Sequence, residues 1–232
     1  IIEWVAARLK APLHAANRDW MAFAERGRLV FQDEDGLLDL PPPRLVGRHQ
    51  FTNAGAAIAT LRAAGLRVPV AAIETGLQTA EWPARMQRLT TGRLVERAGP
   101  AIGELWLDGG HNPGAGAVIA ETMADLEDRS PRPLHLVMGM LTTKNPAGFL
   151  APFAGLARSV TTVPIDGHGS FSADELASVA RSVGLDASPA ASVEEALDAI
   201  AAFSDAAPPR VLICASLYLA GAVPAGTGTP PR

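Results

Sequence analysis

The sequence predicts an α/β protein built around a mainly parallel sheet with helices on both faces. The first observation is that short apolar runs alternate with longer stretches of helical periodicity. We expect strands at 104–107, 134–138, 159–163 and 210–214, and helices at 114–126, 173–183 and 193–203. The second observation is that the last two helices begin with paired carboxylates, which suit the positive end of a helix dipole. Such alternation is typical of β–α–β units and of parallel sheets.

The first eighty residues follow a different pattern. We expect a helix at 1–10, apolar pieces at 20–23 and 29–31, a hairpin turn at 33–36, a stiff proline connector at 41–43, and helices at 51–64 and 69–79. Gly65 fits the position just past a helix C-terminus, and Pro69 fits the first position of a helix. Residues 80–83 form a junction, after which 86–89 and 93–97 are predicted to pair as a hairpin. The expected organisation is therefore 1–80, 81–223 and a disordered tail at 224–232.

Composition narrows the class of protein. The chain has 232 residues, of which 48% are hydrophobic and 19% charged, as in globular proteins. A formal net charge of −4 argues against a nucleic-acid partner, and no apolar run is long enough to span a membrane. The N-terminus lacks the pattern of a signal peptide, and it begins with Ile1, which suggests a fragment or a processed product. The single Cys214 lies in an apolar run and excludes a disulfide framework. We therefore expect a cytoplasmic enzyme or binding domain.

The stretch from Leu105 to Gly114 carries the strongest indication of a site. An apolar strand ends in Asp108, two glycines follow, and a helix then begins with Asn112 as N-cap and Pro113 at its first position. Ligands of open parallel sheets bind beyond the carboxyl ends of the strands, where Asp108 and His111 would lie. The alternative is a tight strand-to-helix turn with a solvated Asp108.

Three other segments contain candidate site residues. Asn53 lies near the start of a predicted helix, where it could bind a base or ribose or simply cap the helix. Arg85 follows the junction and could clamp a phosphate, although a surface arginine is the alternative. Ser216 and Tyr218 follow the last strand, with helix capping and a half-buried ring as their alternatives.

Several kinds of site are absent from the sequence. The five histidines show no metal-binding spacing, so we expect no metal site; His135 is taken as structural and His168 as an exposed loop residue. Gly114 and Gly116 do not form a dinucleotide fingerprint, which argues against a nicotinamide dehydrogenase. Lysine occurs only at Lys10 and Lys144, neither within a Gly-Lys-Ser/Thr motif. This chain therefore lacks the lysine of a P-loop ATPase.

Together these pieces resemble the C-terminal part of folylpolyglutamate synthase/dihydrofolate synthase, in the Mur ligase family. The matching segments are Pro43–Gln50 with Asn53, Trp82–Arg85, Leu107–Pro113 and Ser216–Gly221, which occur in the family's order and span nearly the whole chain. The resemblance implies a Rossmann-like C-terminal domain, preceded by the end of the central P-loop-type domain. It also implies an ATP-dependent acid–amino-acid ligase that adds L-glutamate to dihydropteroate, or to the γ-carboxylate of folates, through an acyl phosphate.

The resemblance further implies roles for individual residues. Asn53, Arg85 and Asp108 would bind ATP, while His111 and Ser216 would bind glutamate. No catalytic residue is assigned in this part, and the ligands of Mg²⁺, like the P-loop, are expected upstream, so we expect the isolated chain to be an inactive monomer. Lys144 matches a Lys-Asp pair of the family, but Asn145 replaces the acid, which puts its charge role in doubt.

Two alternatives remain open. Another Mur-type ligase could join an amino acid to a cell-wall precursor, because substrate choice lies largely outside this chain. A non-catalytic module that binds a nucleotide or metabolite would also account for the missing P-loop.

Overall fold

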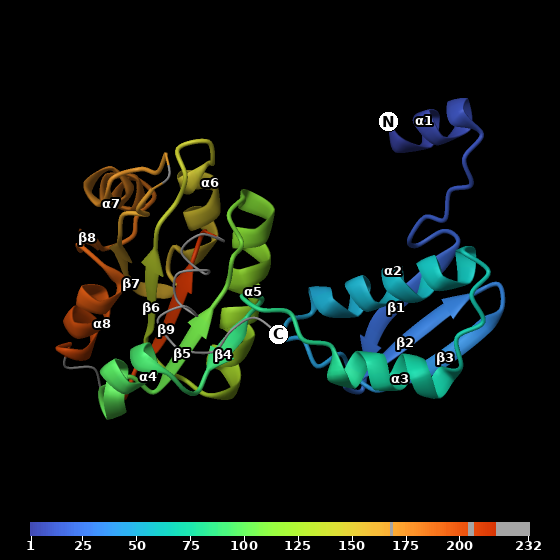
Figure 1. The fold of residues 1–232 in the computed structure, drawn as a ribbon, viewed down its shortest axis with the longest axis horizontal. Helices are drawn as coiled ribbons and strands as arrows, with labels where there is room; N and C mark the ends of the chain where they lie inside the picture. The colour runs from blue at the N-terminus through green and yellow to red at the C-terminus, as the bar shows by residue number, and fades with distance from the viewer. Residues whose placement is uncertain (168, 204–206, 217–232) are drawn as a thin grey trace. The chain divides into compact units, whose positions relative to one another are not determined.

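The computed structural model describes residues 1–167, 169–203 and 207–216, and the chain divides into two compact units (Figure 1). The first unit is Ile1–Glu81 and the second is Trp82–Arg232. In the described ranges no helix has the length and apolar character needed to cross a membrane.

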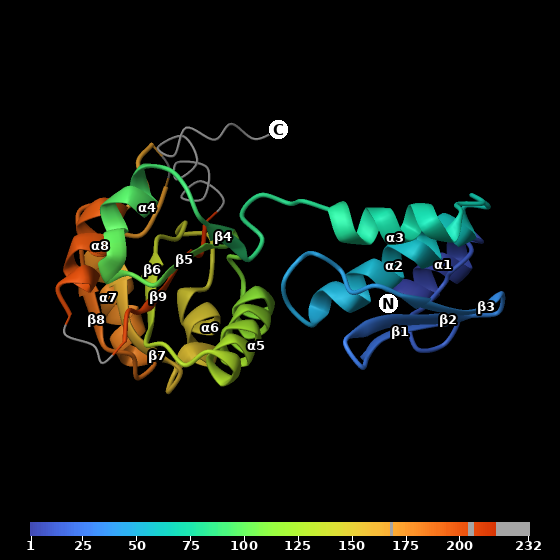
Figure 2. The same ribbon diagram turned by 90° about the horizontal axis from the view of Figure 1, so that it is seen from below.

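The first unit is a three-stranded antiparallel sheet with two helices on one side of it (Figure 2). Its strands are β1 (Trp20–Glu25), β2 (Arg28–Asp33) and β3 (Gly36–Leu40), and its helices are α1 (Ile2–Leu9), α2 (His49–Ala63) and α3 (Val70–Thr79). Arg26 and Gly27, both at positive φ, form the two-residue turn between β1 and β2, as tight hairpins require. The core consists of Trp20, Leu29, Phe31, Leu40, Ile58 and Ala59. Gly55 lets α2 approach β1 closely, because a methyl group there would collide with Ala22.

The described part of the second unit is a six-stranded sheet in the order β4-β5-β9-β6-β7-β8. The strands are β4 (Gln87–Leu89), β5 (Glu104–Leu107), β6 (Leu134–Met138), β7 (Ala157–Thr162), β8 (Ala187–Pro189) and β9 (Arg210–Cys214). Only β4, at one edge, is antiparallel to its neighbour among these strands. Every residue of the central strands β6 and β9 is buried, as expected for strands covered on both faces.

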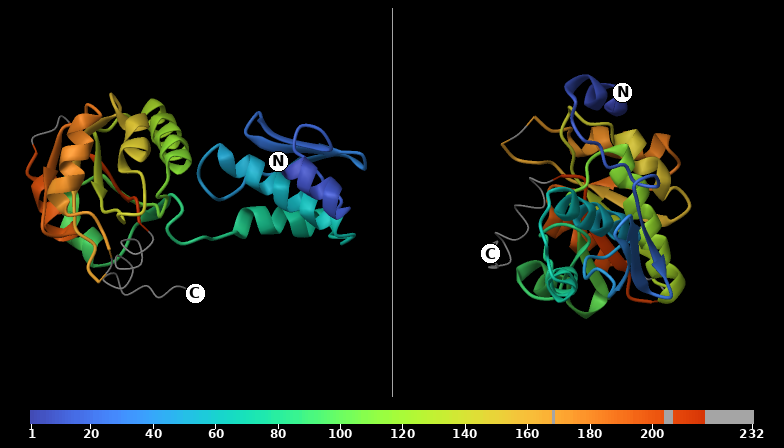
Figure 3. Two further views of the ribbon diagram at one scale, coloured as in Figure 1. Left: turned by 90° about the horizontal axis from the view of Figure 1, so that it is seen from above. Right: turned by 90° about the vertical axis from the view of Figure 1, so that its right-hand side faces the viewer.

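Helices cover both faces of this sheet. They are α4 (Arg93–Ala98), α5 (Pro113–Arg129), α6 (Pro146–Leu150), α7 (Ala173–Ser182) and α8 (Val193–Ala201), with 3-10 turns η1 (Gly99–Ala101) and η2 (Ala151–Phe153). Apolar residues of α4 and α8 share one core cluster with β5, β6 and β9. α5 and α6 lie side by side over the other face (Figure 3). The predicted fold class, a mainly parallel sheet with flanking helices, is confirmed.

Some elements differ from the sequence-based prediction. The hairpin between 86–89 and 93–97 is wrong, because β4 pairs with β5 and residues 93–98 form the helix α4. Leu94 and Ala98 lie four positions apart, so a helix buries both of them against α8, which a strand could not do. Pro69 is the N-cap of α3 rather than its first residue, and β7 begins two residues earlier than predicted. The short elements α6 and β8 were not predicted. The predicted tail at 224–232 lies outside the described residues.

Candidate functional site

Asp108 follows the last residue of β5 and is only 4% exposed, so the alternative of a solvated carboxylate is wrong. Its Oδ1 accepts a hydrogen bond from the Gly110 N–H at 2.7 Å, and its Oδ2 accepts one from the Met86 N–H at 2.8 Å. The carboxylate therefore ties the strand end to two separate backbone segments. The thiol of Cys214 has its pKa raised by burial and, secondarily, by the negative charge of Asp108, so it is protonated and inert.

Arg85 occupies the middle of a tight turn that packs against the end of β5. Both of its neighbours, Ala84 at φ +54° and Met86 at φ +43°, lie in the left-handed region. The Ala84 carbonyl accepts a hydrogen bond from the Gly109 N–H at 2.8 Å, and the Ala84 N–H donates to Gln87 Oε1 at 2.9 Å. Met86 is buried, whereas Arg85 is exposed, and within the described ranges its guanidinium forms no hydrogen bond or ion pair.

The glycine turn after Asp108 orients His111 and starts α5. The His111 Nδ1 lies 3.0 Å from the Gly109 carbonyl oxygen. Because a carbonyl can only accept, Nδ1 carries the hydrogen, and Nε2 is the acceptor of the neutral ring. Asn112 is the N-cap, as predicted, and its Oδ1 accepts from the Ala115 N–H at 2.9 Å. Gly110 has no room for a side chain, since a Cβ would lie within 2.9 Å of Ile119, Ala115 and the Asp108 carboxylate.

Ser216 lies two residues beyond β9, the neighbour of β5, and is 3% exposed. Because these parallel strands end at the same edge, Ser216, Asp108 and His111 belong to one edge of the sheet, and the anchored turn adds Arg85 to it. Ala215, at φ +77°, bends the chain between β9 and Ser216. Tyr218 and His168 lie outside the described residues.

Asn53 belongs to the first unit, where it lies inside α2. The alternative that it caps this helix is wrong, because α2 begins at His49 and its N-cap is Arg48. The Asn53 side chain is exposed, and its Nδ2 donates to Gln50 Oε1 at 3.0 Å.

Asn145 is the N-cap of α6, and its Oδ1 accepts from the Gly148 N–H at 2.9 Å. This position therefore keeps a local structural use without the negative charge of an aspartate.

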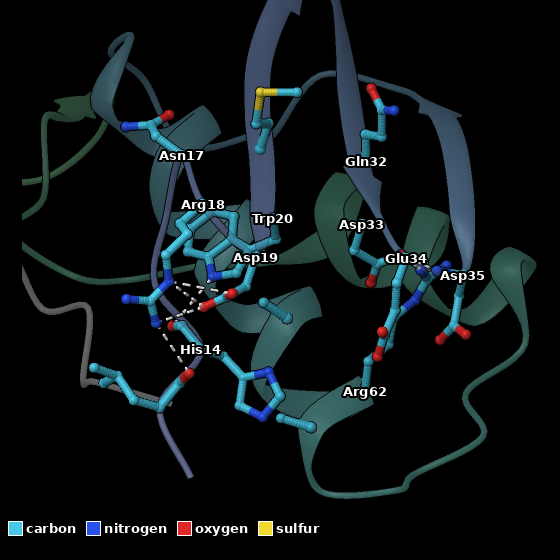
Figure 4. A pocket seen from close by; sticks show the side chains of 14 residues that line it. His14, Asn17, Arg18, Asp19, Trp20, Gln32, Asp33, Glu34, Asp35 and Arg62 are labelled. Carbon is cyan, nitrogen blue, oxygen red and sulfur yellow. Dashed lines mark hydrogen bonds and ion pairs between the residues drawn. The ribbon is translucent and has the colours of Figure 1, made fainter. Parts of the chain in front are cut away.

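A large cavity, about 740 Å³, lies in the first unit, away from all five predicted site residues (Figure 4). Its charged side chains already pair with one another. Arg18 forms ion pairs with Asp19 and Glu3, and Arg62 forms one with Asp33. Volume alone would select this cavity, but its cations are neutralised, so we place the candidate site at the sheet edge instead.

Two features of the second unit were missed by the sequence analysis. Gln87 caps the Arg85 turn, a contact that cannot be foreseen without the left-handed conformation of Ala84. At the opposite end of the sheet, Arg210 is 1% exposed and donates from Nε to Glu104 Oε2 at 2.7 Å. Burial raises the pKa of Glu104, but hydrogen bonds from Arg210 and Trp106 outweigh it, and the pKa lies below its ordinary value.

Comparisons with known proteins bear on this site. No family model matches the chain. A dihydrofolate synthase/folylpolyglutamate synthase of Escherichia coli is 31% identical over 216 residues, which cover 92% of this chain and 46% of that protein. A folylpolyglutamate synthase of Lacticaseibacillus casei is 28% identical over 145 residues, covering 60% of this chain and 31% of that protein. The chain thus spans about half, or less, of these curated relatives.

Solved structures agree in fold. The chain matches the E. coli FolC complex with DHPP and ADP at a TM-score of 0.80 and 29% identity, over 96% of this chain and 49% of that one. It matches the Yersinia pestis bifunctional enzyme complexed with AMPPNP and Mn ion at 0.79 and 27%, over 97% and 49%. Over almost its whole length, the chain is therefore related in both sequence and fold to the folylpolyglutamate synthase/dihydrofolate synthase family.

Proposed function

We propose that the chain is the C-terminal half of an ATP-dependent ligase that adds L-glutamate to dihydropteroate or to the γ-carboxylate of folates. The names of the relatives support the reaction class, and the ADP and AMPPNP in their structures support a nucleotide partner. In this proposal residues 1–80 end the central ATP-binding domain, and residues 81–223 form the Mur-type C-terminal domain.

The single observation that carries the proposal is the anchoring of the Arg85 turn at the carboxyl end of β5. It presents an exposed guanidinium beside a buried carboxylate, a glycine turn and a helix start. A guanidinium can bind phosphate oxygens in a bidentate manner, and helix starts favour anions. We assign Arg85 to the nucleotide phosphates, and Asp108 and Asn53 to the rest of the nucleotide.

His111 and Ser216 are the proposed glutamate contacts. With Nδ1 held by the Gly109 carbonyl, the neutral His111 ring offers Nε2 to the α-ammonium group of glutamate. The Ser216 hydroxyl, at the end of the neighbouring strand, can donate to a carboxylate.

The residues of this chain fit a nucleotide better than a metal. In the part of the chain that the structure describes, no group of three or more His, Cys, Asp or Glu side chains could hold a metal ion. We therefore assign any Mg²⁺ ligands to a segment outside this chain. ATP would supply the phosphoryl group that activates the acceptor carboxylate, and the residues here would orient its phosphates and exclude water.

The experiment is ADP release by the complete open reading frame that contains this chain. Glutamate is supplied with dihydropteroate, with a reduced folate, or with a cell-wall nucleotide precursor. Turnover with a pterin alone supports the proposal, whereas turnover with the cell-wall precursor moves the substrate to another Mur-type ligase. Silence with all three acceptors, with nucleotide still bound, would favour a binding module and overturn the proposal.

A further inference from the structure

We propose that Gln87, together with Asp108, is a positioning residue that holds the Arg85 turn in a strained conformation and thereby fixes the point from which the Arg85 side chain leaves the backbone. The inference rests on the proposed role of Arg85 as a nucleotide contact. Gln87 itself faces the backbone of the turn and has no role in the function proposed above.

The conformation of the turn requires an external support. Side chains other than glycine seldom adopt the left-handed region, yet both neighbours of Arg85 do so, Ala84 at φ +54° and Met86 at φ +43°. Two such residues around a single exposed arginine persist only where the surrounding structure specifies them. A strained segment next to a candidate ligand contact suggests that its geometry serves function.

Three hydrogen bonds supply this support, and each reaches a different part of the turn. The Gln87 Oε1 accepts from the Ala84 N–H at 2.9 Å, the Gly109 N–H donates to the Ala84 carbonyl at 2.8 Å, and the Asp108 Oδ2 accepts from the Met86 N–H at 2.8 Å. Gln87 opposes Leu107 in the β4–β5 pairing, so the same strand end supports both acceptors. Every backbone N–H flanking Arg85 on these two residues is thus satisfied by a side chain.

The side chains of the turn divide the work in the same direction. Met86 is 2% exposed and anchors the turn in the core, while Arg85 extends outward. Arg88, the next exposed arginine, differs, because it lies in the regular strand β4 and its Nη2 approaches Glu104 Oε1 at 3.7 Å. Only Arg85 combines a strained, capped backbone with an unengaged guanidinium in the described residues of this segment. Arg88 is therefore a matched control.

The first test measures the turn in the 232-residue chain itself. Gln87→Met keeps the side-chain length but removes the acceptor, and we expect amide hydrogen exchange at Ala84 to accelerate by about tenfold, as for a hydrogen bond worth one decade. Gln87→Glu retains an acceptor oxygen and should keep Ala84 protected. Unchanged exchange in Gln87→Met overturns the inference.

The second test measures kcat and KM for ATP in the complete open reading frame. We expect Gln87→Met to raise the KM for ATP by about tenfold, since a misplaced contact costs one to two decades. Gln87→Glu and Arg88→Ala should stay close to the wild type. If Arg85→Ala raises the KM and Gln87→Met does not, the positioning role is wrong. If Arg85→Ala also has no effect, the proposed function of Arg85 fails, and the exchange experiment alone decides whether Gln87 holds the turn.

Discussion

The two ends of the parallel sheet in the second unit use charge in opposite ways. At the amino end, Glu104 and Arg210 pair with each other inside the protein, and Arg210 also lies 3.6 Å from Glu127. At the carboxyl end, Asp108 accepts from backbone N–H groups, and the exposed cation Arg85 forms no ion pair among the described residues. The amino end therefore stabilises the fold, while the carboxyl end keeps a charge available for a ligand, as in other parallel sheets.

The largest expected effect tests the amino end. Arg210→Met leaves the Glu104 carboxylate without its main partner, and breaking a buried pair costs about 3–5 kcal/mol of unfolding free energy. We expect this loss in chemical denaturation, with the KM for ATP unchanged in the protein that remains folded. A raised KM would mean that the two ends are not separate in function.

Arg85→Ala tests the carboxyl end in the opposite sense. We expect kcat/KM for ATP to fall by about 10²-fold in the complete open reading frame, because a preorganised charge contact is lost, while the unfolding free energy changes by less than about 0.5 kcal/mol. Arg88→Ala, which removes an exposed charge of the same kind, should keep kcat/KM near the wild-type value. Equal losses in both variants would indicate a general effect of net charge.

The strands were predictable where burial dominates. The expected strands at 104–107, 134–138 and 210–214 coincide with β5, β6 and β9, because continuous apolar runs suit strands covered on both faces. The antiparallel edge was not predictable in the same way. At β4 and α4 the apolar residues fit either period, and the choice depends on α8, which lies about a hundred residues away.

The site was predictable in outline only. Asn112 and Pro113 announce the strand-to-helix turn locally, and the structure confirms them as N-cap and first residue of α5. The bonds of Asp108 to Met86 and of Glu104 to Arg210 join positions 22 and 106 residues apart. Such contacts depend on the topology of the sheet, which local patterns do not specify.

Gly110→Ala sharpens the comparison at an intermediate size of effect. The added methyl would crowd Ile119 and the Asp108 carboxylate, and overpacking of this kind costs about 1–3 kcal/mol. Because the carboxylate also anchors the Arg85 turn, we expect the KM for ATP to rise together with the loss of stability. Gly114→Ala is the matched control, since a methyl there meets only Asn112 at 3.4 Å. A destabilised Gly110→Ala enzyme with a normal KM would separate the glycine turn from nucleotide binding.

The smallest effect concerns acid. The pKa of Glu104 is lowered in the folded chain, so this carboxylate binds fewer protons folded than unfolded, and it stabilises the fold above the ordinary glutamate pKa of about 4.3. That stabilisation is lost as the pH falls through the lowered value. We therefore expect unfolding free energy to decline less steeply below about pH 4.3 in the double variant Glu104→Gln/Arg210→Met than in the wild type. Carboxylates elsewhere, such as Asp198 and Glu175, are common to both proteins, so their contributions cancel in the difference. Parallel acid profiles would show that Glu104 and Arg210 contribute no proton linkage, and that the amino end is held by packing rather than by charge.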